Sequence, residues 1–341
     1  MKRDGLVRGD NMKNNDFEYK KLRELKKMSL QELSSYYRML RNYEFETNKQ
    51  LESSYLKKKI YFLTKLILKI DRILSGRKLI LFDDKRENNI SKGKVYASSH
   101  VGRYDIESAM EAIDEQVYFV MGDPEETYIN FEGFFLDKIQ GRICTDTGYN
   151  IYDIFKKYKE GQELTNNEKK LYNEYKKDRH ICEVTCTRRI ANKDNILIYP
   201  EGAWNVTPRL TQTLFPGAAR IAINGDGIII PIGIVRDNKK YTVNIGKEMD
   251  VSGANEKDTK DITNQLKENI NSLVGEIVFN NDEIYLRSQF KKNPYENELD
   301  YLDNIMSESE NGYTLDVIEK TRYYDNDYPE NVIGNQYIKK L

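Results

Sequence analysis

The spacing of apolar residues divides the chain into a helical first part and a second part of shorter, alternating segments. Residues 17–75 contain neither Pro nor Gly, and apolar side chains recur at helical spacing from Leu56 to Leu74. Strong helix formers in this pattern predict helices, and the Gly76 that follows predicts where the last of them ends.

From Lys94 onward, short apolar or β-branched runs alternate with helical patterns. The runs predict strands at 95–98, 117–121, 142–145, 196–199, 228–235 and 241–245. The patterns between them predict helices at 107–113, 132–140, 150–159, 168–193, 218–224 and 258–278. This alternation predicts an α/β fold: a mixed central sheet flanked by helices, with an N-terminal helical region. Pro231 lies inside a predicted strand, which we therefore expect at an edge or a bulge of the sheet.

We expect three parts along the chain. Residues 1–77 form a basic helical region, residues 78–280 the α/β domain, and residues 281–341 an acidic tail rich in tyrosine. The aromatic residues of the tail favour packing on the domain over disorder. Residues 159–180 are polar and charged, which indicates an insertion that shapes access to the domain.

Composition and apolar run lengths limit the class of protein. The mean hydropathy is −0.74, but 25 Tyr and 12 Phe supply a core, so the chain should fold. The most apolar run, residues 60–70, is interrupted by Lys65 and Lys69, whereas a membrane-spanning helix needs about 20 apolar residues. No signal peptide is visible, and three cysteines do not form the pattern of a disulfide framework. These features predict a cytoplasmic protein.

The overall charge of −1 conceals a strong asymmetry. Residues 1–94 contain 24 Lys and Arg against 13 Asp and Glu, so this part of the chain favours an anionic partner. Lysines alternate with Leu, Ile and Phe at helical spacing, which is typical of a helix lying on a membrane surface and suits lipid better than nucleic acid. The alternative is a core-packing helix with a solvated lysine face. We therefore expect peripheral contact with membrane lipid and no nucleic-acid partner.

Candidate chemistry begins at His100, one of only two histidines. His100 follows predicted strand 95–98, and Asp105 lies five residues later. An imidazole held by a carboxylate through one ring nitrogen can accept a proton at the other, which is what a general base requires. Acidic residues number 55 of 341, so the pair alone is a weak signal.

A second candidate is the turn Tyr199-Pro200-Glu201-Gly202, which follows an apolar strand. Such a turn places Glu201 at the carboxyl edge of a sheet, where open α/β folds bind ligands. An ordinary surface turn is the alternative. A third segment, residues 216–235, combines a helix, a glycine-rich turn and the strand with Pro231.

In order, these segments resemble the glycerolipid acyltransferase family of the lysophosphatidic acid type. The His-x4-Asp signature is His100 to Asp105, the second block is residues 141–146, the third is residues 199–202, and the fourth runs from Gly217 to Pro231. The resemblance covers about residues 78–280, and four blocks in the family's order are more specific than any one.

The resemblance implies transfer of an acyl group from a thioester, acyl-coenzyme A or acyl carrier protein, to an acceptor hydroxyl. His100 would deprotonate that hydroxyl, and Asp105 would orient the imidazole. Glu201 would help to hold the acceptor, and Gly202 would allow close approach of the backbone to substrate. Backbone amides near the third and fourth blocks would stabilise the oxyanion. The thioester is a co-substrate, and no bound cofactor is expected.

Two departures from the family's pattern concern the acceptor. Thr147 and Trp204 stand where the family commonly has arginines associated with the acceptor's phosphate. Arg103, Arg142 or Arg209 could replace them. The alternatives are a non-phosphate acceptor, such as a glycolipid or an envelope glycan, and a lipid-binding relative without turnover.

Other motifs are weaker or absent. His180, Cys182 and Cys186 are close in sequence but lack the fourth ligand of a zinc site, so we expect no metal. The sequence has no phosphate-binding loop of the G-x4-G-K-[ST] type, no G-x-G-x-x-G fingerprint and no G-x-S-x-G elbow.

Overall fold

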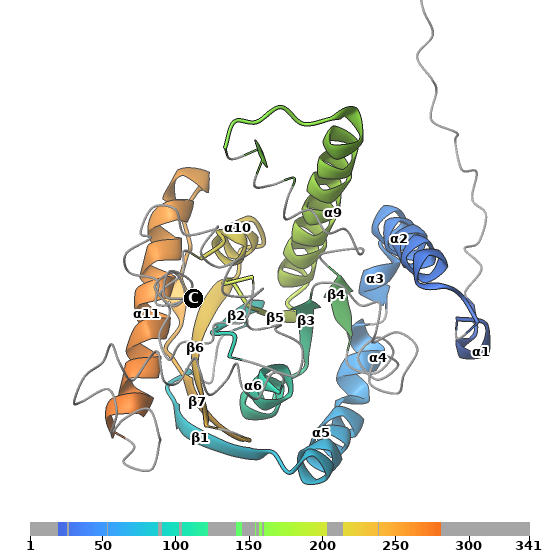
Figure 1. Cartoon of the computed structure of the whole chain (residues 1–341). Coiled ribbons are helices and arrows are strands. Elements are labelled where there is room, and N and C mark those ends of the chain that lie inside the picture. The colour runs from blue at the N-terminus through green and yellow to red at the C-terminus, as the bar shows by residue number, and fades with distance from the viewer. Residues whose placement is uncertain are drawn as a thin grey trace, which may run out of the picture.

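The computed structural model describes residues 20–25, 27–52, 54–87, 91–101, 104–121, 141–144, 154, 157–158, 160–202, 214–237 and 239–280 (Figure 1). Within them the helices are α1 (Leu22–Leu25), α2 (Leu30–Thr47), α3 (Lys49–Glu52), α4 (Ser54–Lys59), α5 (Tyr61–Ser75), α6 (Asp105–Ile113), α9 (Asn166–Ala191), α10 (Gly217–Asn224), the short η2 (Glu256–Asp258) and α11 (Thr259–Asn280). The strands are β1 (Lys78–Asp84), β2 (Lys94–Ser98), β3 (Val117–Met121), β4 (Arg142–Cys144), β5 (Asn195–Ile198), β6 (Ile228–Asp237), β7 (Lys240–Ile245) and β8 (Met249–Asp250).

The strands form one mixed sheet in the order β1-β7-β6-β2-β5-β3-β4, with β8 paired to β6. The strands β6, β2, β5, β3 and β4 are parallel, whereas β7 and β8 run antiparallel to β6. The predicted α/β class is confirmed. All six predicted strands are present within a few residues, while β1 and β8 were not predicted.

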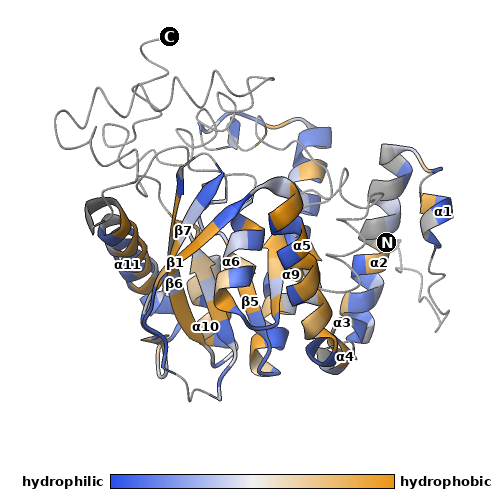
Figure 2. Cartoon of the chain, turned by 90° about the horizontal axis from the view of Figure 1, so that it is seen from below, coloured by the Kyte–Doolittle hydropathy of each residue, from blue (hydrophilic) through white to orange (hydrophobic). Residues whose placement is uncertain are grey.

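Successive residues of the strands face two different cores because side chains alternate across a sheet. Val95 and Ala97 of β2 lie in the core that also contains buried residues of α9, α10 and α11. Tyr96 lies in the opposite core with residues of α6 and with Leu68 of α5. The domain therefore has three layers, with helices on both faces of the sheet (Figure 1). Figure 2 shows hydrophobic residues concentrated on the strands and on the inward sides of these helices.

The predicted helical first part is confirmed for the described residues, as α1 to α5. Gly76 ends α5 with φ +68°, a left-handed conformation that glycine adopts readily. Two lysines of the basic region, Lys57 and Lys58 of α4, contact the domain. Lys57 is buried, and Lys58 pairs at 2.8 Å with the fully buried Asp194 carboxylate. Asp194 also pairs with the buried Arg189 at 3.3 Å, so Lys58 adds a second cation that links α4 to the domain.

The helix predicted at 168–193 is confirmed as α9, and it contains most of the stretch 159–180, whose role as an insertion remains a prediction. Residues 166–180 are the first half of α9, which continues without a break to Ala191. A capping box starts this helix: the Thr165 hydroxyl accepts the N–H of Glu168, and the Glu168 carboxylate accepts the N–H of Thr165. The polar composition reflects a helix end that projects beyond the sheet (Figure 1).

Pro231 was expected at an edge or a bulge of the sheet, and the edge position is wrong. The strand β6 lies inside the sheet, between β2 on one side and β7 and β8 on the other. Pro231 falls between the residues paired with β8 and those paired with β7, where no ladder bond needs its missing N–H. Its carbonyl accepts the N–H of Gly246 at 2.9 Å.

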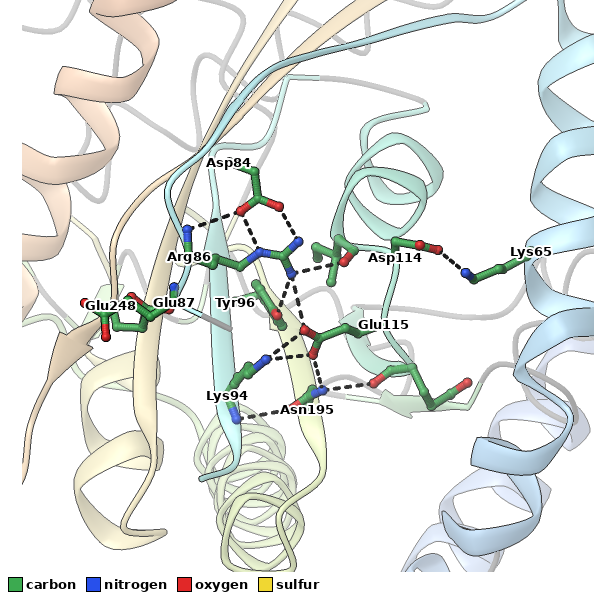
Figure 3. Close-up of polar contacts among 12 residues, drawn as sticks. Lys65, Asp84, Arg86, Glu87, Lys94, Tyr96, Asp114, Glu115, Asn195 and Glu248 are labelled. Carbon is green, nitrogen blue, oxygen red and sulfur yellow. Dashed lines mark hydrogen bonds and ion pairs between the residues drawn. The ribbon is translucent and has the colours of Figure 1, made fainter. Parts of the chain in front are cut away.

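A polar network joins the amino ends of the parallel strands (Figure 3). The Glu115 carboxylate, just before β3, accepts hydrogen bonds from Lys94 Nζ at 2.7 and 3.0 Å and from Asn195 Nδ2 at 2.9 Å. Lys94 and Asn195 are the first residues of β2 and β5. Arg86 donates to the Tyr96 hydroxyl at 2.9 Å from beyond the end of β1. We call these side chains, together with Asp84, the amino-edge network.

In the described part of the chain, no helix has the length and apolarity that crossing a membrane requires. The predicted tail, residues 281–341, the predicted helix at 132–140 and most of the predicted helix at 150–159 lie outside the described residues. The division into parts at 77 and 280 remains a prediction.

Candidate active site

The loop after β2 is fixed to the neighbouring strand before it reaches His100. The Ser99 N–H donates to the Ile232 carbonyl at 3.1 Å, and the Ser99 hydroxyl accepts the Ile234 N–H at 2.8 Å. Because β2 and β5 are parallel neighbours, the residues that follow them, His100 and Glu201, meet at one edge of the sheet.

His100 and Asp105 form the hydrogen bond that the sequence predicted. Nδ1 of His100 lies 2.7 Å from Oδ2 of Asp105, and the same oxygen accepts the Val101 N–H at 2.7 Å. Asp105 is the first residue of α6, where the partial positive charge of a helix N-terminus favours a carboxylate. A carboxylate beside Nδ1 selects the tautomer with the proton on Nδ1, which leaves Nε2 as the proton acceptor.

The side chains of His100 and Asp105 differ in their exposure to solvent. The Asp105 side chain is 1% exposed and the His100 side chain 17% exposed. The carboxylate is therefore closed off from water, while part of the imidazole can meet a substrate. This division of roles matches a base and its orienting group.

Glu201 holds the backbone of the histidine loop. Its Oε1 accepts the His100 N–H at 2.9 Å, and the side chain is buried. The turn depends on Gly202, which has φ +70° and in which a Cβ would lie 2.5 Å from the Phe215 ring. The third block of residues, 199–202, therefore contacts the His100 backbone through Glu201. Contact of Glu201 with the acceptor remains a prediction.

Tyr199 is a site residue that the sequence analysis did not single out. Its ring centroid lies 4.3 Å from that of His100, at an interplanar angle of 31°. Burial, followed by the charges of Asp105 and Glu107, raises the pKa of Tyr199 well above its usual value, so the phenol stays neutral. No local signal marked this contact, because it depends on β5 lying beside β2 in the sheet.

The start of α10 lies beside the same turn. The Phe215 N–H donates to the Pro200 carbonyl at 2.7 Å, and α10 begins two residues later at Gly217. Among the described residues, no side chain caps this N-terminus. Its first-turn amides are therefore candidates for stabilising negative charge.

Arg103, Thr147, Trp204 and Arg209 lie outside the described residues. The backbone of Arg142 begins β4, the strand at the end of the sheet, and pairs with Phe119.

The cysteine and histidine candidates for a metal site lie on α9. Cys182 and Cys186 are buried, whereas His180 is exposed on the same helix. Within the described ranges, no group of three His, Cys, Asp or Glu side chains is placed to hold a metal ion.

Comparison with known families agrees with the residues. Residues 82–235 match the family model described as Acyltransferase, and this segment contains both the His100 loop and the turn with Glu201. Residues 82–235 therefore match the acyltransferase family, as the motifs predicted.

Among solved structures, the chain is similar to the crystal structure of the 1-acyl-sn-glycerophosphate (LPA) acyltransferase PlsC from Thermotoga maritima. The two share 13% sequence identity and a TM-score of 0.44 over 72% of this chain and 94% of that chain. A likeness of this degree adds nothing to the argument from the family model and the site. No curated protein matches the sequence.

Proposed function

We propose that the chain transfers an acyl chain from a thioester, acyl-coenzyme A or acyl carrier protein, to the hydroxyl of a lysophospholipid such as 1-acylglycerol-3-phosphate or of a related lipid. The observation that carries the proposal is the 2.7 Å bond between His100 Nδ1 and Asp105 Oδ2, inside the segment matched to the acyltransferase family. The buried carboxylate and the part-exposed imidazole support a general base.

In the proposed reaction, Nε2 of His100 accepts the proton of the acceptor hydroxyl while the oxygen of that hydroxyl attacks the thioester carbonyl. A C–O bond forms and the C–S bond breaks, and the leaving thiolate takes the proton from the His100 imidazolium to give the free thiol. Negative charge develops on the carbonyl oxygen, and the N-terminal amides of α10 are the proposed donors to it. Asp105 stabilises the imidazolium through Nδ1.

The acceptor has a second candidate, because Thr147 and Trp204 replace the two arginines associated with phosphate in the family's pattern. Arg103, Arg142 and Arg209 are the proposed substitutes. If they do not bind phosphate, a glycolipid or an envelope glycan is the proposed acceptor instead. A relative that binds lipid without turnover has no evident need for the His100 and Asp105 pair.

A transfer assay tests the reaction and its acceptor. Labelled acyl groups are offered as coenzyme A and carrier-protein thioesters, in parallel, to a total lipid and envelope extract, with wild type and His100→Ala. We expect a labelled product from wild type alone, and mass spectrometry of that product separates phosphate from sugar acceptors. Thioester binding without product from wild type would contradict the proposal, as would turnover retained by His100→Ala.

The proposed partner surface is the outer side of α5, facing membrane lipid. We call Phe62, Leu66, Ile70, Ile73 and Leu74 the α5 stripe; all five side chains are exposed, with Leu74 at 82%. Lys59, Lys65 and Lys69 are exposed beside them. Apolar side chains flanked by lysines support docking on an anionic lipid surface. The proposed location is therefore peripheral, at the cytoplasmic face of the membrane.

Vesicle binding tests this surface. A double variant, Phe62→Ser with Leu66→Ser, should lose sedimentation with phosphatidylglycerol-containing vesicles, and salt should weaken wild-type binding. Met39→Ser removes an apolar side chain of similar exposure from α2 and is the matched control. Equal binding by the double variant and wild type would contradict the assignment.

A further inference from the structure

Two side chains, Tyr241 of β7 and Ser108 of α6, hold the residue that precedes Asp105. Tyr104 is the N-cap of α6, and no side chain of its own caps the helix. Its N–H donates to the hydroxyl of Tyr241, on β7, at 3.4 Å. Its carbonyl accepts the Ser108 hydroxyl at 2.6 Å as well as the Ser108 N–H at 3.1 Å. The peptide groups on both sides of Tyr104 are therefore fixed by side chains.

Ser108 is in turn held by a buried cation. Arg77 Nη1 donates to the Ser108 hydroxyl at 3.1 Å and to Glu111 at 3.2 Å, while Nη2 pairs with Asp71 at 3.4 Å. The Arg77 side chain is completely buried, between the end of α5 and the start of β1. A serine that bonds the carbonyl four residues back is common in helices, but a buried guanidinium on that serine is not required by the helix. The guanidinium is a rigid fork, so it fixes the hydroxyl in one orientation.

The Asp105 carboxylate has little freedom to move. Its Oδ2 accepts two hydrogen bonds of 2.7 Å each, from Val101 N–H and from His100 Nδ1. A small rotation of the first turn of α6 would lengthen one of them. Whatever fixes Tyr104 therefore sets the alignment of the imidazole.

We propose that Arg77 is a positioning residue of this site, which acts through Ser108 and the Tyr104 carbonyl to orient Asp105 and thereby His100. This inference rests on the proposed role of the His100 and Asp105 pair. This role would also connect α5 to the site, because α5 and α6 lie side by side (Figure 1) and Arg72 of α5 pairs with Glu111 of α6 at 3.0 Å.

Ser108→Ala is the cleanest variant. It removes the hydroxyl but leaves both carboxylate partners of Arg77, and alanine favours the helix. The matched control is Asp114→Asn, at the other end of α6, which breaks the 2.6 Å pair with Lys65 while asparagine tolerates the left-handed φ of 51°. Arg77→Lys is the second variant, because one ammonium group cannot replace the several N–H donors of the planar guanidinium.

Two measurements report the result. Kinetics with palmitoyl-coenzyme A and 1-acylglycerol-3-phosphate should show kcat lowered roughly three- to tenfold in Ser108→Ala and Arg77→Lys, with KM for both substrates nearly unchanged. Selective 15N labelling of histidine gives only two imidazole spectra, and the exposed His180 serves as the internal reference. We expect the Nδ1–H signal of His100 to weaken in both variants and to persist in Asp114→Asn.

Wild-type kcat together with an unchanged Nδ1–H signal in Ser108→Ala would overturn the inference. So would an equal loss of kcat in Asp114→Asn, which would indicate a general effect on α6. If wild type transfers no acyl group, the proposed function fails, whereas the histidine spectra still report whether Arg77 and Ser108 orient Asp105.

Discussion

The two edges of the sheet both carry buried or half-buried charges, but the charges are used differently. In the amino-edge network, Glu115 is surrounded by Lys94, Asn195 and Arg86, which belong to three segments of the chain. At the carboxyl edge, Asp105 and Glu201 each bind the short loop that carries His100. One edge pairs charges to join strands, and the other places one carboxylate on the His100 imidazole and a second on the His100 backbone.

This difference separates stability from chemistry within one sheet. A polar network whose members satisfy one another stabilises a fold but offers nothing to a substrate. At the carboxyl edge, the side chain of His100 stays partly exposed while its partners are buried. We therefore expect substitutions at the carboxyl edge to lower activity and substitutions at the amino edge to lower stability.

The largest expected effect is that of Asp105→Asn on turnover. The amide keeps the shape but removes the charge that favours a proton on Nδ1, so kcat should fall roughly 10²- to 10⁴-fold. Steady-state kinetics measures the loss, and thermal unfolding checks that the variant is folded. Turnover near the wild-type value would break the assignment of the carboxyl edge as the reactive one.

Gly202→Ala should damage the carboxyl edge through the backbone. Alanine disfavours φ +70°, and its Cβ would lie 2.5 Å from the Phe215 ring, so the turn that carries Glu201 must shift. We expect a loss of about 2–4 kcal/mol in the free energy of unfolding, together with reduced turnover of the folded fraction. Urea unfolding gives the first value. A stable variant with full activity would show that the turn need not hold His100 in place.

Glu115→Gln should show the opposite pattern at the amino edge. Neutralising the carboxylate weakens its bonds to Lys94 and Arg86, but Glu115 is one-third exposed, so solvent reduces the cost to about 1–2 kcal/mol. Turnover per folded molecule should match wild type. Activity lost without any loss of stability would contradict the division between the edges.

The sequence predicted the sheet well where patterns are local. The strands at 95–98 and 117–121 are short apolar runs whose pattern predicts a strand from local sequence alone, and both are present. Strand β1 was missed because its residues 78–84 mix apolar and charged side chains, and its pairing with β7 depends on residues about 160 positions away. The edge position expected for Pro231 was wrong for the same reason. A proline fits inside this sheet only where two partner strands meet, and that place depends on residues far away in the sequence.

The site followed from sequence only in part. The spacing of His100 and Asp105 predicted their contact because a strand end and the next helix start are adjacent in such folds. The Tyr199 ring and the bond from His100 N–H to Glu201 could not be predicted, because both require knowing that β5 lies beside β2. Order along the chain does not specify order across the sheet.

The smallest expected effect is the acid sensitivity of the amino edge. Burial tends to raise the pKa of Asp84, but its hydrogen bonds to Arg86 and the charge of Arg86 outweigh burial and lower it. A group whose pKa is lower in the folded state stabilises the fold above its unfolded pKa of about 3.9, and this stabilisation is lost as pH falls through the folded value. Asp84 is 30% exposed, so the contribution should stay under about 1 kcal/mol.

Asp84→Asn isolates that contribution. Urea unfolding of wild type and variant between neutral pH and pH 3 should show wild type more stable at neutral pH, with the two curves converging below about pH 4. Other carboxylates titrate alike in both proteins, so the difference reports Asp84 alone. A stability difference independent of pH would show that the Asp84 charge does not act through Arg86, and that the amino edge depends on the pairs around Glu115.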